Sequence, residues 1–138
     1  MKVVKNNCYG GFGLSPLAIL EYAKLKGIDL FMYKRQFDYK TFKKVHNLED
    51  IKNSTFGPDY STKDWGETCT DEEINESYFS IFDIKRDDKA LVEVVEKLGD
   101  NANGYFSNLK VVEIPDDIEW EIDDYDGLET IHEKHRSW

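Results

Sequence analysis

Cysteine is scarce in this chain, because Cys8 and Cys69 are the only two among 138 residues. Two cysteines do not supply the several cross-links of a disulfide-stapled domain. Long hydrophobic runs are missing too, and no stretch approaches the roughly 18 apolar residues of a membrane-spanning helix. The first eleven residues lack the apolar core of a secretory signal. These absences predict a protein of a reducing cytoplasm that makes no contact with membranes.

Positive charge is also in short supply. Residues 1–46 hold nine Lys/Arg and three Asp/Glu (+6), whereas residues 47–138 hold nine and 25 (−16), which gives the formal net charge of −10. An acidic protein repels the backbone of nucleic acids and anionic membranes, so neither is an expected bulk partner. The basic portion can still hold a small anion, or pair with the acidic remainder of the same or another copy.

The chain is long enough and, with 14% aromatic residues, apolar enough to bury a hydrophobic core. No repeat, linker or low-complexity tract divides it, so we expect a single domain over residues 1–138. Residues 50–76 contain a Gly-Pro pair and many small polar residues, and they predict one long irregular loop.

Residues 15–27 predict the clearest helix of the chain. Ser15 is a good N-cap, Pro16 suits the first helical position and Gly27 can end the helix. The residues expected on its apolar face are Leu17, Leu20, Ala23 and Leu25.

A second helix is expected over residues 87–99, begun by Asp87 and ended by Gly99. Residues 125–135 predict a turn followed by a short C-terminal helix. The ranges that predict strands are 1–4, 28–36, 39–47, 77–84, 108–115 and 117–124. This order predicts an α+β fold, in which a mixed or antiparallel sheet carries the two main helices on one face.

Residues 6–15, NNCYGGFGLS, form a glycine-rich connection between the first strand and the first helix. Backbone N–H groups at a helix N-terminus attract anions, and glycine lets a phosphate or carboxylate come close to the main chain. The spacing fits neither the phosphate-binding lysine motif nor the dinucleotide fingerprint. The stretch is therefore either a tight connection or an anion site. The ligand-binding residues expected in the second case are Cys8, Gly10, Gly11, Phe12, Gly13 and Ser15.

Aromatic and basic residues are interleaved between Tyr33 and Phe42. Aromatic rings stack on nucleobases, and cationic side chains neutralise phosphates. We therefore expect Tyr33 and Arg35 to contact a ligand, with Arg86 as a second cation beside the start of the later helix. The alternative is a half-buried hairpin whose Lys and Arg stems cover apolar surface.

Carboxylates are concentrated in residues 116–126, where they alternate with apolar residues. This pattern is typical of a strand with one solvated acidic face. It also fits a surface that meets a basic partner protein. The partner-binding residues expected in that case are Glu119, Glu121 and Asp123, with Tyr60 and Trp65 of an aromatic loop at 56–65 as anchors.

Cys8 and His132 are candidates for chemistry. A cysteine near a helix N-terminus can act as a nucleophile, and His132 or His135 can act as a base. No spacing links these residues, and a small buried cysteine is the simpler interpretation. The two histidines at helical spacing do not make a metal site by themselves. We expect no catalytic residue, no metal and no cofactor.

Segments at both ends of the chain resemble one family. The segments NNCYGGFGLSPLA, MYKRQ, DDKALVEVVEKLG and LKVVEIPDDIEWEIDDYDGLE are similar to those of small phage and prophage proteins that open with N-x-C-[YF]-G-G-F-G-L-S. Residues 50–76 are the most variable part of the likeness. The resemblance implies a setting in the cytoplasm of an infected host bacterium and an accessory, anti-defence role. It carries over no catalytic residue.

These observations leave three hypotheses open. The first is a protein that binds and sequesters a small nucleotide-derived anionic signal, with a homo-oligomer completing the pocket. The second is an inhibitor that binds a host defence protein through its acidic strand and aromatic loop. The third is a nucleotide-processing enzyme that uses Cys8 or His132.

Overall fold

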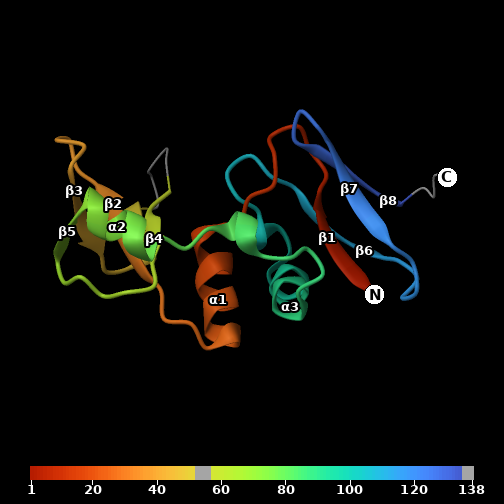
Figure 1. Cartoon of the computed structure of the whole chain (residues 1–138), viewed down its shortest axis with the longest axis horizontal. Coiled ribbons are helices and arrows are strands. Elements are labelled where there is room, and N and C mark those ends of the chain that lie inside the picture. The colour runs from red at the N-terminus through yellow and green to blue at the C-terminus, as the bar shows by residue number, and fades with distance from the viewer. Residues whose placement is uncertain (52–56, 135–138) are drawn as a thin grey trace. The chain divides into compact units, whose positions relative to one another are not determined.

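The chain forms two compact units in a computed structural model that describes residues 1–51 and 57–134. The first unit contains Met1–Tyr22 and Phe82–Trp138, and the second contains Ala23–Ile81. Both are built from helices and small antiparallel sheets (Figure 1), so the α+β fold class is confirmed. The single domain predicted from the length stays a prediction.

The first unit has two pairs of strands. β1 (Lys2–Asn6) pairs with β6 (Leu109–Glu113), and β7 (Trp120–Tyr125) pairs with β8 (Leu128–Glu133). β8 also runs beside β1 (Figure 1). α3 (Lys89–Leu98) packs against β1 and β6, and its apolar face is buried there. The strands predicted over 1–4, 108–115 and 117–124 are thereby confirmed as β1, β6 and β7.

The helix caps follow the sequence closely. α1 (Pro16–Lys26) begins at Ser15, whose Oγ accepts the Ala18 N–H at 3.1 Å, and it is followed by Gly27 at φ 71°. α3 ends at Gly99 as predicted, but its N-cap is Asp88 and not Asp87. The 3₁₀ turn η3 (Gly99–Ala102) follows α3 directly.

The buried face of α1 differs from the predicted one. Ala23 is buried as predicted, but Leu17 and Leu25 are exposed and Leu20 is only partly buried. The other residues buried along this helix are Ala18, Ile19 and Tyr22. Tyr22 explains the difference for the part of α1 that belongs to the first unit, because its hydroxyl donates a hydrogen bond of 2.8 Å to the Asp88 carboxylate. Because its hydroxyl has a hydrogen-bond partner, the Tyr22 ring can be buried on the face of α1 that packs inward, in place of the predicted leucines.

The second unit is a four-stranded antiparallel sheet in the order β4-β2-β3-β5. Its strands are β2 (Phe31–Arg35), β3 (Thr41–Val45), β4 (Asp59–Ser61) and β5 (Thr68–Thr70). α2 (Asp71–Ser77) contacts β4 and β5 and so covers one face of the sheet (Figure 1). The core of this face consists of Tyr33, Phe42, Cys69 and Ile74.

Three predicted segments are wrong. Residues 50–76 were expected to be irregular, yet they contain β4, β5 and most of α2, together with the end of η1 (Leu48–Ile51). Residues 52–56 of that range lie outside the described residues. Residues 77–84 form the 3₁₀ turn η2 (Ile81–Asp83) and one bridge between Tyr78 and Ser61, not a strand. The C-terminal helix is absent from the described part of 125–135, which forms β8 instead.

Candidate functional site

The turn between β2 and β3 presents two aromatic side chains to solvent. Phe37 is 99% exposed and Tyr39 is 73% exposed. Asp38 fixes the turn between them, because its Oδ1 accepts the backbone N–H groups of Lys40 at 2.9 Å and Thr41 at 3.0 Å. These hydrogen bonds stabilise the carboxylate and hold the pKa of Asp38 below its usual range.

Tyr39 adopts a left-handed backbone conformation with φ 59°, which is uncommon for a residue other than glycine. Arg35 holds it there, because Nη1 donates a hydrogen bond of 2.6 Å to the Tyr39 carbonyl. The other guanidinium nitrogen, Nη2, lies 3.0 Å from Asp71 Oδ1, and the guanidinium lies 4.6 Å from the centre of the Phe42 ring. Arg35 therefore anchors the turn and adds positive charge to it.

A cavity of about 730 Å³ lies beside this turn. Its described lining residues are Lys34, Arg35, Gln36, Phe37, Tyr39, Lys43, Gly57 and Asp59. Lys34 and Lys43 are direct partners in the register of β2 and β3, so their side chains emerge on the same face of the sheet. Arg35 is the next residue along β2, so its side chain emerges on the opposite face, where it already pairs with Asp71. The cavity therefore combines two lysines of one sheet face with two exposed rings, and its volume lies within the range of small-molecule sites.

One carboxylate belongs to the same cavity. The pKa of Asp59 is raised mainly by burial, and the neighbouring Asp71 adds to the shift while Arg35 opposes it. A carboxylate in this position can accept hydrogen bonds from N–H groups of a ligand. Such a group would add selectivity to a site whose cations and rings attract many anions.

A second cavity, of about 680 Å³, lies in the first unit. Its lining residues are Met1, Lys2, Asp87, Lys89, Val92, Glu93, Glu96 and Asp116. Carboxylates outnumber the lysines there, and Lys2 is already paired with Glu96 at 3.1 Å. This cavity is less suited to an anion than the one beside the β2–β3 turn.

Other segments of the first unit pack directly against the glycine-rich stretch. A Cβ atom on Gly10 would overlap the carbonyl of Phe106, and one on Gly127 would overlap the backbone of Gly11. The Gly13 carbonyl accepts the Gly104 N–H at 3.1 Å. Two other segments of the chain therefore approach these glycines closely, which is what the tight-connection interpretation requires.

Donors expected to face an anion at the start of α1 are also used internally. The Ser15 N–H donates to the Ala102 carbonyl at 2.9 Å, and Ser15 Oγ donates to the Asn101 carbonyl at 2.6 Å. The Ala18 N–H donates to Ser15 Oγ. Because these groups already have partners, an anion site here is not what the structure favours.

Arg86 is likewise engaged inside the first unit. Its guanidinium lies 3.6 Å from the centre of the Phe12 ring, and it makes a two-pronged ion pair with the buried Glu129. The structure does bring Arg86 and Phe12 together, as residues of one site would be. Their contact completes a buried network, however, and leaves the guanidinium little freedom to meet a ligand.

Three other expected contact residues are less accessible than predicted. Tyr33 is fully buried, because its hydroxyl donates to the Gly66 carbonyl and accepts the Trp65 N–H, each at 2.9 Å. Tyr60 is also buried, and burial raises the pKa of its hydroxyl. Trp65 is half-buried, with its ring N–H bonded to Ser77. The two aromatic anchors expected in the loop at 56–65 therefore pack in or against the core, and residue 56 lies outside the described residues.

Cys8 has two oxygen partners. Its thiol donates to the Phe106 carbonyl at 2.9 Å, and Sγ lies 3.5 Å from Asn6 Oδ1. These contacts place Cys8 in the packing around the glycines. His135, the second histidine considered as a base, lies outside the described residues.

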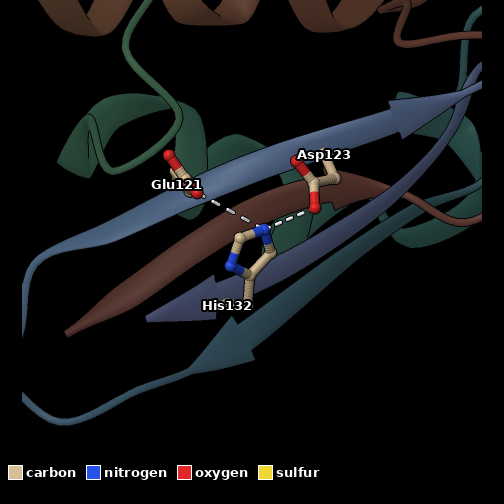
Figure 2. A group of neighbouring side chains, drawn as sticks. All are labelled: Glu121, Asp123 and His132. Carbon is tan, nitrogen blue, oxygen red and sulfur yellow. Dashed lines mark hydrogen bonds and ion pairs between the residues drawn. The ribbon is translucent and has the colours of Figure 1, made fainter. Parts of the chain in front are cut away.

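The acidic strand is confirmed as β7, whose carboxylates Glu121 and Asp123 are exposed as predicted, and Glu119, which directly precedes the strand, is exposed too. Figure 2 shows that Glu121 and Asp123 point toward His132 of β8. His132 Nε2 lies 2.5 Å from Asp123 Oδ2 and 3.7 Å from Glu121 Oε1. A hydrogen bond with the Glu133 carbonyl and the neighbouring carboxylates raise the pKa of His132.

No protein-family model, curated protein or solved structure matches the chain. The resemblance to small phage proteins therefore stays a prediction. Among the residues that the structure describes, no helix is both long and apolar enough to span a membrane.

Proposed function

We propose that the protein binds a small anionic ligand with an aromatic group, of the nucleotide class, in the cavity beside the β2–β3 turn. One observation carries this proposal: Lys34 and Lys43 line the same cavity as the exposed rings of Phe37 and Tyr39. Cations recognise phosphate, and stacking on an aromatic ring recognises a base.

The strained turn supports this proposal. A non-glycine residue at φ 59° costs free energy, and Arg35 uses a hydrogen bond to hold it. The Tyr39 ring therefore remains largely exposed to solvent and available to a ligand. Ordering an aromatic ring in advance lowers the entropy that binding must offset.

The function that we infer is sequestration, since cations and rings supply affinity and orientation without reacting. The phage setting implied by the sequence resemblance makes a host nucleotide-derived signal the expected ligand. A second copy of the chain would close the open side of the cavity if the predicted homo-oligomer forms.

The first experiment is native mass spectrometry of the protein purified from bacteria, before and after heat extraction. A bound species of nucleotide mass that is released intact supports the proposal and identifies the ligand. Calorimetric titration of the extracted protein with cyclic nucleotides and ADP-ribose then measures affinity. A protein that carries no ligand and binds no member of this panel contradicts the proposal.

Variants test whether the cavity is the site. Lys43→Ala and Phe37→Ala should each weaken binding by about tenfold, since one stacked base or one charged contact contributes about 1–3 kcal/mol. Lys110→Ala and Tyr105→Ala are matched controls, because both residues are exposed and belong to the first unit. Equal losses in the cavity variants and the controls would exclude this cavity.

A second candidate function rests on the exposed carboxylates of β7. We infer that the row formed by Glu119, Glu121 and Asp123 can dock on a basic surface of a host protein. Glu119→Lys and Glu121→Lys should then abolish a salt-sensitive complex with that protein while nucleotide binding stays unchanged. A complex that survives both changes would contradict this candidate.

A further inference from the structure

The β7–β8 hairpin gathers three potential metal ligands on one face. Glu121 and Asp123 are two residues apart on β7, so they share a face of the strand. His132 is the direct partner of Glu121 in the register of the hairpin. The backbone pairing thus brings the three side chains together.

The ligating atoms of these three side chains already converge. One atom from each of Glu121, Asp123 and His132 lies within 4.8 Å of the others. Figure 2 shows both carboxylates directed at the imidazole across the hairpin. All three residues are open to solvent to some degree, so an ion can enter without opening the fold.

The second nitrogen of the His132 ring indicates which atom would face a metal. Nδ1 lies 3.2 Å from the backbone carbonyl of Glu133, and a carbonyl only accepts, so Nδ1 carries the hydrogen. Metal-binding histidines usually donate their other ring N–H to a carbonyl or carboxylate in this way. This contact, which lies outside the three-residue cluster, directs Nε2 toward Asp123 and Glu121.

We propose that His132, Asp123 and Glu121 form a binding site for a divalent transition metal of the zinc class. One imidazole nitrogen and two carboxylate oxygens suit zinc and its neighbours better than magnesium or calcium, which prefer oxygen ligands alone. Two carboxylates also neutralise the charge of the ion. The three side chains leave a further position for water or for a group of a partner.

A small rearrangement admits the ion. Ligands of a tetrahedral zinc ion lie roughly 3.4 Å apart, given metal bonds of about 2.1 Å. The distance of 3.7 Å between Nε2 and Glu121 Oε1 is close to this value, whereas the 2.5 Å to Asp123 Oδ2 is too short. Asp123 has a side chain 73% exposed and can rotate outward while its strand stays in place.

Zinc titration of the chelator-treated full chain tests the proposal. We expect one equivalent of zinc per chain by calorimetry, and cobalt should give the visible absorption of a low-coordinate site. His132→Gln and Asp123→Asn should each weaken zinc binding by more than about tenfold, as expected for the loss of a ligand. Nuclear magnetic resonance shifts of the bound form should centre on β7 and β8.

His46→Gln is the matched control. His46 Nε2 lies 2.8 Å from a single carboxylate, Glu67, on the exposed surface of the second unit, so it imitates one half of the site. This variant should bind zinc as the natural chain does. The proposal is overturned if the chain takes up no zinc, or if His46→Gln and His132→Gln weaken binding equally. It is also overturned if Asp123→Asn changes nothing, because the ion would then be held by histidine alone.

Discussion

Arg86 and Glu129 form a two-pronged ion pair in the interior of the first unit. Nη1 lies 2.6 Å from Oε1 and Nη2 lies 2.8 Å from Oε2, and the two side chains are only 18% and 4% exposed. Glu129 Oε1 also accepts the backbone N–H of the fully buried Asn6 at 2.7 Å. The Glu129 carboxylate of β8 thus pairs with Arg86, which precedes α3, and accepts the backbone N–H of Asn6, the last residue of β1.

Glu129→Gln should destabilise the first unit by about 3 kcal/mol, because it leaves the Arg86 cation without its buried counter-charge. The measurement is urea unfolding followed by circular dichroism. Glu113→Gln changes an exposed glutamate of β6 and should have little effect. Equal midpoints for the two variants would show that the pair contributes nothing.

Gly10→Ala should destabilise the chain strongly, whereas Gly13→Ala should be tolerated. A Cβ on Gly10 would overlap the Phe106 carbonyl, but a Cβ on Gly13 would meet nothing closer than the Gly104 Cα at 3.8 Å. We expect a loss of more than about 2 kcal/mol for Gly10→Ala, as for other steric conflicts in a core. Thermal unfolding of both variants checks this, and equal melting temperatures would contradict close packing at Gly10.

Tyr22 should make the chain sensitive to alkali. Burial and the hydrogen bond to Asp88 raise the pKa of Tyr22 to about 12, while in the unfolded chain the group ionises near the usual tyrosine pKa of about 10. Between these values the folded state binds more protons, so the free energy of unfolding falls as pH rises. The slope from this one group approaches about 1.4 kcal/mol per pH unit.

Tyr22→Phe removes this ionisation, so its stability should fall less steeply between pH 10 and 12 than that of the natural chain. Urea unfolding at several pH values in this window measures the slope. Tyr105→Phe changes an exposed tyrosine and should keep the natural slope. A natural slope in Tyr22→Phe would mean that other groups cause the alkaline loss.

Local patterns in the sequence predicted much of the fold. The caps Ser15 and Gly99 and the alternation in β7 are confirmed, because each depends on neighbours in the chain. One local signal was missed, since Thr70 and Glu73 form the capping box that begins α2. The turn predicted at the start of 125–135 is present, but Asp126-Gly127, with both φ values positive, makes it the two-residue turn of a hairpin and not the approach to a helix.

The cluster of Glu121, Asp123 and His132 depends on the β7–β8 hairpin. The sequence predicts a helix around His132, where its neighbours would be Glu129 and His135. In β8 it faces Glu121 and Asp123 instead, so the three-residue cluster could not be found without the hairpin register. The burial of Tyr33 was equally beyond the sequence, because both partners of its hydroxyl lie more than thirty residues away.

Tyr39→Asn should separate stability from binding. Tyr39 sits at φ 59°, a conformation that asparagine adopts more readily than tyrosine. The Arg35 hydrogen bond goes to the Tyr39 carbonyl, which the substitution keeps. We therefore expect the second unit to gain up to about 1 kcal/mol of stability, since the ring is mostly exposed and its packing loss is small.

The same change removes an aromatic ring from the proposed ligand cavity, so nucleotide affinity should fall by about tenfold while stability rises. Urea unfolding and calorimetric titration of one preparation measure both effects. Phe37→Ala, at a neighbouring exposed position of the turn, should lower affinity without the gain in stability. A more stable Tyr39→Asn variant with unchanged affinity would mean that the strained turn serves something other than the ligand.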